Sequence, residues 1–177
     1  TIIVKPPKES NLVSNDNTII GNTVLYGATS GKLFASGQAG ERFAVRNSGA
    51  ESVIEGCDSN GCEYMTGGTV VILGKVGDNF SAGMTGGMAF VYDPKNEFKN
   101  YVNPNSVVWQ EPETTYWKNY LKNLINEHFK ETHSKIAQKI LQDFNSEVKK
   151  FQQICPKEML DKLSNPLTMN IKKLKAI

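Results

Sequence analysis

The sequence lacks the features that mark membrane-spanning, secreted and nucleic-acid-binding proteins. Its 177 residues contain no apolar run long enough to cross a bilayer, so no membrane partner is predicted. The segment that begins at Thr1 has no charged region followed by a long apolar stretch, so no signal peptide is predicted. Because Thr1 is not an initiator methionine, we expect a chain that is processed or cut from a longer one. Lys plus Arg is 20 and Asp plus Glu is 18, and this near balance gives no reason to expect a nucleic-acid partner.

Glycine-rich phosphate-binding loops are also missing. No two glycines are separated by a single residue, which excludes the G-x-G-x-x-G dinucleotide pattern. Gly56 and Gly61 have the spacing of a P-loop, but Cys62 follows where that motif requires lysine. Calcium-binding nonapeptide repeats need glycine pairs and an aspartate in every unit, and only Asp58, Asp78 and Asp93 are available here. We therefore predict that this chain binds no cofactor of its own.

Few residues are candidates for catalysis or metal binding. Cys57, Cys62 and Cys155 are the only cysteines, and the first two have no second pair to complete a zinc site. His128 lies on an apolar helical stripe, which favours a place at the edge of the core. No nucleophile elbow and no H-E-x-x-H motif occurs, so no catalytic residue and no metal ligand is assigned. A general acid/base pair formed through space stays open, with the candidates Glu41, Glu51, Glu55 and Glu63.

The glycines that are present follow a regular spacing. All 15 lie between Gly21 and Gly87. Steps of six and three residues recur among them, and two such units make a repeat of 18 residues that is lengthened once to 19. So short a repeat is typical of a coil of short strands, in which glycine lets stacked backbones approach closely. The structural glycines of the repeat are Gly31, Gly37, Gly40, Gly49, Gly68, Gly74, Gly77, Gly83 and Gly86.

Apolar residues within each repeat unit alternate with more polar ones, which indicates strands. The spacing by two predicts that Phe34, Val71 and their counterparts point into the coil. The sequence therefore predicts a parallel β-helix of about four or five coils over residues 20–93, with rungs 18 to 19 residues apart. The segments expected to be strands are Thr23–Tyr26, Phe43–Arg46, Thr69–Leu73 and Met88–Tyr92.

Composition divides the chain into two parts. Residues 1–111 carry 8 basic and 11 acidic side chains, whereas residues 112–177 carry 12 basic and 7 acidic ones. The resulting net charges of −3 and +5 favour docking of the second part on the first. We predict a parallel β-helix domain over 1–111 and a helical extension with a basic tail over 112–177. The fold class is thus all-β with a small α part.

The second part is predicted to be a helical pair. Apolar residues recur at helical spacing over Tyr116–Phe129 and again over Ile136–Phe151. Ser134 is expected to cap the second helix, and Pro156 is expected to stop it. Two antiparallel helices are the simplest arrangement of these segments. The basic segment Asn165–Ile177 is expected to be a mobile tail.

One polar cluster interrupts the strand-rich repeat. Glu41, Arg42, Arg46 and Asn47 fall within seven consecutive positions of otherwise apolar sequence. Arginine is favoured at protein interfaces because its guanidinium makes forked contacts with carboxylates and carbonyl groups. The cluster is therefore a candidate interdomain interface, and pairing of these side chains with one another or with Glu63 is the alternative.

Five motifs of the sequence are IGNTVLYGAT (20–29), LFA (33–35), GERFAVRNSGA (40–50), CEYMTGG (62–68) and NFSAGMTGG (79–87). Together they resemble a known family, the C-terminal GXGXG domain of the glutamate synthase large (alpha) chain. The resemblance spans roughly residues 1–163 and includes helical positions such as His128, Ser134 and Ala137. The sequence departs from the family over residues 57–60, where CDSN replaces a family segment that contains histidine.

The resemblance implies a right-handed β-helix within an enzyme that makes two glutamates from glutamine and 2-oxoglutarate. In that family the glutaminase and FMN synthase sites, with an iron–sulfur cluster, belong to other domains. The β-helix is a non-catalytic scaffold between those domains, so this chain alone is expected to be inactive. The resemblance further implies a cytoplasmic location, or an organelle stroma in a eukaryote.

Two alternative functions remain open at this stage. Formylmethanofuran dehydrogenase shares the domain, so the chain is alternatively a β-helix subunit of another oxidoreductase complex. An autonomous β-helix enzyme that acts on a carbohydrate or acyl substrate is the second alternative. Hexapeptide acyltransferases of that kind use a catalytic histidine, and neither histidine of this chain lies in the repeat region.

Overall fold

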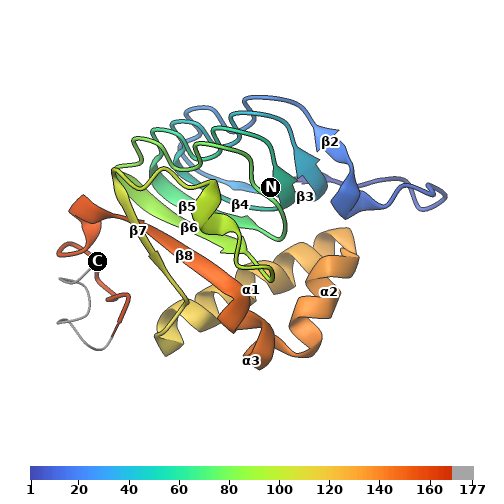
Figure 1. Cartoon of the computed structure of the whole chain (residues 1–177). Coiled ribbons are helices and arrows are strands. Elements are labelled where there is room, and N and C mark those ends of the chain that lie inside the picture. The colour runs from blue at the N-terminus through green and yellow to red at the C-terminus, as the bar shows by residue number, and fades with distance from the viewer. Residues whose placement is uncertain (169–177) are drawn as a thin grey trace.

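Four parallel strands, stacked in chain order, form one wall of a solenoid in the computed structural model, which describes residues 1–168 (Figure 1). Phe34 pairs with Val53, Val53 with Val71, and Val71 with Phe90, so successive rungs are 19, 18 and 19 residues apart. The predicted parallel β-helix and its rung spacing are confirmed. These strands are β3 (Lys32–Ala39), β4 (Ser48–Cys57), β5 (Thr66–Ile72) and β6 (Gly86–Tyr92).

Short strands extend this sheet at both of its edges. At one edge β1 (Ile2–Val4) and β2 (Thr18–Ile20) pair in parallel with the two ends of β3. At the other edge β8 (Phe151–Pro156) runs antiparallel to β6 and to β7 (Val107–Gln110). Because β8 follows the helices in the chain, the N-terminal and C-terminal parts contribute to one sheet.

Three helices lie along one side of the sheet, opposite the loops that close the coils (Figure 1). They are α1 (Thr115–Thr132), α2 (Lys135–Gln142) and α3 (Phe144–Glu147). The predicted N-cap is confirmed, because the Ser134 hydroxyl accepts a hydrogen bond of 3.1 Å from the Ala137 N–H. None of the helices within residues 1–168 is long and apolar enough to cross a membrane.

The prediction that the second helix continues to Pro156 is wrong. The helical segments end at Lys150, and residues Phe151–Pro156 form β8 instead. Five of the six β8 residues are buried, including Gln153, so the strand carries no polar face that would reveal its period of two. The open edges of β6 and β7 supply the hydrogen bonds that favour a strand here.

The tail prediction is corrected in part. Asn165 and Leu167 are fixed on the body of the protein, since their carbonyl groups accept hydrogen bonds from Trp117 and Gln110. The Leu167 side chain is also fully buried. The remainder of the predicted tail, residues 169–177, lies outside the described residues.

The predicted strands Thr23–Tyr26 and Phe43–Arg46 are wrong, because these segments form tight corners of the coil. Arg42, Ala44 and Arg46 have φ values of 61°, 58° and 54°, so every second residue is left-handed. The N–H groups of Arg42 and Arg46 donate to carbonyl groups of the next coil at 2.9 and 3.0 Å. Hydrogen bonds between the coils thus compensate for a left-handed backbone conformation that non-glycine residues rarely adopt.

The strands separate two hydrophobic cores, and this arrangement corrects a second prediction. Alternate residues such as Ile54, Val70 and Ile72 fill the interior of the coil. Phe34 and Val71 were expected to share that interior, but they point outward into the helical layer. The period of two predicts which residues share a face, but it does not identify which face meets the helices. The outward core includes Phe34, Val53, Val71, Phe90, Leu121, Leu124, Ile125 and Ile140.

Most of the repeat glycines lie against backbone or side-chain atoms of a neighbouring coil. A Cβ atom at Gly86 would lie 2.0 Å from the carbonyl oxygen of Thr66, closer than any real contact allows. Of the nine glycines in the repeat, a Cβ atom would come within 2.5 Å of a neighbour at all except Gly31. Close stacking of the coils is therefore the physical reason for the glycine spacing.

Candidate functional site

The polar cluster found in the sequence lies at one corner of the coil. Glu41, Arg42 and Arg46 are exposed there. The Arg42 guanidinium lies 3.7 Å from the Glu63 carboxylate, and the Arg46 guanidinium lies 5.9 Å from the centre of the Tyr26 ring. Each arginine thus has one local partner, but both side chains remain exposed to solvent.

Asn47 is separated from the rest of the cluster because its side chain is fully buried. Its amide donates to the carbonyl groups of Ala50 at 2.9 Å and of Gly67 at 3.3 Å, and it accepts from the Ala50 N–H at 3.1 Å. Asn47 therefore links two coils from within. Three of the four predicted interface residues remain available to a partner.

A stripe of two tyrosines and one arginine crosses the same corner. Backbone hydrogen bonds place Gly27, Arg46, Tyr64 and Gly83 in register on successive coils. Tyr26, next to the first of these, and Tyr64 are each 52% exposed. Sequence reasoning missed both tyrosines, although Tyr64 follows Arg46 by one repeat of 18 residues and was therefore detectable from the repeat.

A buried polar cluster joins the solenoid to the helices. Glu55 on β4 accepts hydrogen bonds from Ser36 on β3 and from Ser134, the N-cap of α2. The His128 Nε2 atom on α1 lies 3.8 Å from the same carboxylate, and all four side chains are buried. Burial raises the pKa of Glu55, but the contacts with His128, Ser134 and Ser36 outweigh burial and lower the pKa below its ordinary value. The carboxylate is therefore charged at neutral pH.

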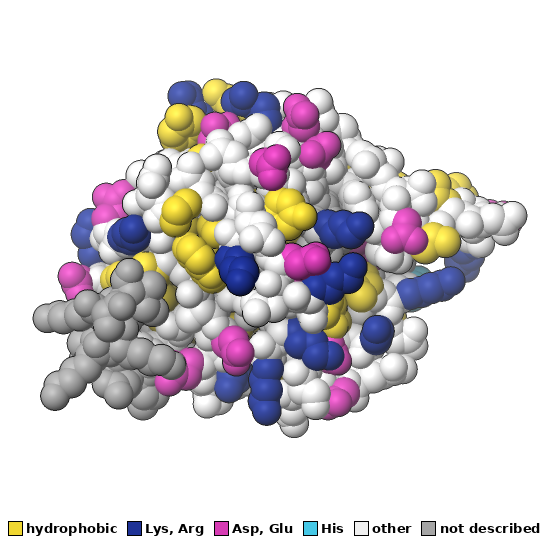
Figure 2. Space-filling model, viewed as in Figure 1, with side chains coloured by type: hydrophobic (Ala, Val, Ile, Leu, Met, Phe, Trp, Pro, Cys, Tyr) yellow, Lys and Arg dark blue, Asp and Glu magenta, His cyan; other side chains and the backbone are white. Residues whose placement is uncertain are grey.

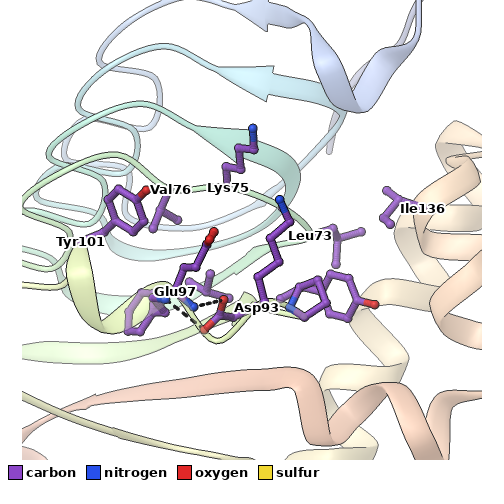
Figure 3. A pocket seen from close by; sticks show the side chains of 13 residues that line it. Leu73, Lys75, Val76, Asp93, Glu97, Tyr101 and Ile136 are labelled. Carbon is purple, nitrogen blue, oxygen red and sulfur yellow. Dashed lines mark hydrogen bonds between the residues drawn. The ribbon is translucent and has the colours of Figure 1, made fainter.

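A hollow of about 360 Å³ opens between the solenoid and the start of α2 (Figure 3). Apolar side chains such as Val76 and Phe98 line most of it, and Lys75 and Glu97 stand at its rim. The Asp93 carboxylate is occupied within its own loop, where it accepts from the N–H groups of Glu97 and Phe98. None of the described residues that line the hollow is a histidine or a cysteine.

The described residues do not fit a metal or an iron–sulfur cluster. Within residues 1–168 no group of three or more His, Cys, Asp or Glu side chains is placed to hold a metal ion. Burial raises the pKa of the Cys57 and Cys155 thiols to about 12, and it raises that of Cys62 well above its ordinary value. The three cysteines are free, and none of them belongs to a group of three or more possible ligands within the described residues.

Charge on the visible surface does not single out a partner of one sign. In Figure 2 basic and acidic side chains are intermingled over the face shown, without a continuous area of either charge. This mixture agrees with the formal net charge of +2 for the whole chain. A polyanion such as nucleic acid finds no extended basic surface on this face.

Comparison with known families decides the classification. The GXGXG motif family matches residues 1–157, which is most of the chain. The chain belongs to the GXGXG family. The family match covers the solenoid, all three helices and β8, so the helical layer and the last strand lie within the matched region.

This GXGXG chain is similar to glutamate synthases from distant organisms. It is 63% identical over 167 residues to the glutamate synthase [NADPH] large chain of Azospirillum brasilense, which covers 94% of this chain. It is 48% identical to both the glutamate synthase [NADH] of Schizosaccharomyces pombe and the chloroplastic ferredoxin-dependent glutamate synthase of Spinacia oleracea, over 89% and 88% of this chain. The similarity spans only 11%, 7% and 10% of those three relatives.

Proposed function

We propose that this GXGXG chain is the non-catalytic scaffold domain of a glutamate synthase large chain. The observation that carries the proposal is the similarity over nearly the whole chain to large chains named for three electron donors. A domain that accompanies NADPH, NADH and ferredoxin alike is suited to a task independent of the donor. Holding the glutaminase and synthase domains at a fixed separation is such a task.

Rigidity of the solenoid supports this role. The rungs of β3 to β6 are joined by parallel ladders, and the corners are joined by further hydrogen bonds between coils. Two buried cores stabilise the sheet from both of its faces. A stiff body of this kind can hold two neighbouring domains at a fixed separation, as a spacer between two active sites requires.

FMN and the iron–sulfur cluster, which the family resemblance implies for the whole enzyme, are assigned to its other domains. No group of three or more His, Cys, Asp or Glu side chains within residues 1–168 is placed to hold a metal ion, which supports this assignment. The partners of this chain are then the glutaminase and FMN synthase domains of the same enzyme. We assign the contact with the synthase domain to the exposed part of the polar cluster, namely Glu41, Arg42 and Arg46.

The test replaces Arg42 and Arg46 by alanine, singly and together, in the full-length large chain. Synthesis of glutamate per glutamine hydrolysed is expected to fall, because misplaced domains lose ammonia to solvent, while each half-reaction persists. The control is Lys99→Ala, which removes an exposed positive charge elsewhere on the solenoid. Unchanged coupling in the double variant would show that the cluster is not the interface.

A further inference from the structure

The corner of the solenoid carries a second feature beyond the polar cluster, formed by Tyr26, Arg46 and Tyr64. We propose that this tyrosine–arginine stripe docks a carboxylate-bearing segment from another part of the same large chain. The inference rests on the proposed function, because it requires this chain to be part of a glutamate synthase. It adds the chemistry of the partner and two contact residues that the polar cluster does not include.

The side chains of the stripe lie on neighbouring coils. The Arg46 guanidinium lies 5.9 Å from the centre of the Tyr26 ring, within the range of a cation–π contact. The Tyr64 ring lies directly over Gly83, where a Cβ atom would come within 2.5 Å of the ring. Glycine on the fourth coil therefore provides the space in which the ring lies flat.

Two residues of the stripe stand where other coils have glycine. In register with Gly27 and Gly83, which have φ values of 63° and 64°, Arg46 and Tyr64 adopt φ values of 54° and 53°. Glycine occupies this conformation without strain, whereas a bulky residue is strained in it. Ala44 has the same left-handed backbone and gains burial in the core, whereas Arg46 and Tyr64 face solvent, as the left-handed residues Thr23, Arg42 and Asn79 also do.

The polar groups of the stripe lack partners within the described chain. Among residues 1–168 no carboxylate pairs with Arg46, although Arg42 has Glu63. Neither the Tyr26 nor the Tyr64 hydroxyl makes a hydrogen bond within the described part of the chain. Arg42 and Arg46 are also the only arginines in the sequence, and the remaining 18 basic residues are lysines. A surface that needs only positive charge would accept lysine, whereas a forked contact with a carboxylate requires arginine.

Charge and composition together define the occupant. An unpaired guanidinium between two half-exposed rings matches a carboxylate side chain flanked by apolar residues. Tyrosine and arginine are the residue types that contribute most binding energy at protein interfaces. In the relatives, the region matched by this chain is only 7% to 11% of the large chain, so the remainder of the same polypeptide offers such a segment at high effective concentration.

Photo-crosslinking in the full-length large chain tests the proposal. A benzophenone amino acid is introduced in place of Tyr64, and separately in place of Tyr26, and the crosslinked peptides are identified by mass spectrometry. We expect both positions to capture one segment of the same large chain that contains Asp or Glu. The yield from position 64 should fall about tenfold in an Arg46→Gly background, the loss expected for one strong interface contact.

The glycine variants separate docking from folding. Glycine is native at the equivalent positions of two other coils, so Arg46→Gly and Tyr64→Gly should leave the thermal unfolding of the domain unchanged or slightly raised. A fall in crosslinking without a fall in unfolding temperature supports docking. Arg46→Lys keeps the positive charge but loses the paired N–H donors of the guanidinium. Its crosslinking yield should therefore be only slightly higher than that of Arg46→Gly.

Each outcome decides between the two proposals. Capture of a second copy of the chain, capture of a different subunit, or no capture at either position would overturn the docking surface. Capture of the acidic segment, together with unchanged coupling of the half-reactions in the variant with both Arg42→Ala and Arg46→Ala, would uphold the docking surface and show that the polar cluster is not the interface that couples the two sites. Loss of coupling in Arg42→Ala without any crosslink at Tyr26 or Tyr64 would uphold the scaffold role. It would place the interdomain contact at the polar cluster and not at the tyrosine–arginine stripe.

Discussion

The imidazole of His128 and the carboxylate of Glu55 face each other across the boundary between the helices and the solenoid, with Nε2 3.8 Å from Oε1. Both side chains are fully buried, and neither ring nitrogen nor the second carboxylate oxygen has a hydrogen-bond partner within residues 1–168. The hydroxyls of Ser36 and Ser134 complete the cluster. The boundary between the helical layer and the solenoid, which is otherwise formed by a hydrophobic core, therefore contains a buried carboxylate.

Glu55→Gln should make the protein less sensitive to acid. The folded state lowers the pKa of Glu55 below its ordinary value of 4.5, so the ionised carboxylate stabilises the fold above that pH. This stabilisation is lost as the pH falls through the folded pKa. Urea unfolding between roughly pH 3 and 6 should give a shallower decline of the unfolding free energy in Glu55→Gln than in the native chain. The exposed Glu97→Gln serves as the control, and an equal decline in Glu55→Gln and the native chain would contradict the prediction.

Val71→Asp should destabilise the fold severely. Val71 is fully buried between the sheet and the helices, so an aspartate there is either an unpaired charge or an unsatisfied carboxyl group. We expect a loss of roughly 4 kcal/mol or more in the free energy of unfolding, measured by urea denaturation. Val13→Asp makes the same chemical change at a side chain that is 55% exposed, and it should cost less than about 0.5 kcal/mol.

Gly86→Ala should disrupt the stacking of two coils. Its new Cβ would lie 2.0 Å from the Thr66 carbonyl oxygen, and a backbone atom cannot move aside as the end of a side chain can. A drop of roughly 2 kcal/mol or more in unfolding free energy is expected from the forced shift of the backbone. Gly21→Ala is the matched control, because no atom lies within 4 Å of the position that its new methyl group would take. Similar thermal stability of the two variants would argue against close coil packing as the reason for Gly86.

The chain produced by itself is expected to be colourless and inactive. Its described residues offer no group of three or more side chains placed to hold a metal ion. Absorbance between roughly 350 and 500 nm, where flavins and iron–sulfur clusters absorb, should therefore be absent. Assays for glutamine hydrolysis and for glutamate formation should both be negative. A yellow or brown protein, or glutamate made by this chain alone, would refute the prediction.

Local sequence determined the features that depend on spacing along the chain. The glycine steps predicted the rung spacing of 18 to 19 residues, because each close approach between coils recurs at the same point of every turn. Thr69–Leu73 and Met88–Tyr92 were predicted as strands, and β5 and β6 confirm them almost entirely. Ser134 was predicted as an N-cap because capping is a contact between residues three apart.

Tertiary structure decided every feature that depends on what lies beside a segment. Phe43–Arg46 has the composition of a strand, but hydrogen bonds from neighbouring coils hold it in left-handed corners. Phe151–Pro156 continues an apolar helical pattern, but the unpaired edges of β6 and β7 make it a strand. The meeting of Glu55 with His128 joins residues 73 positions apart, and no spacing rule anticipates it. Each outcome depends on a partner distant in the chain, and a single sequence does not encode such partners in any local pattern.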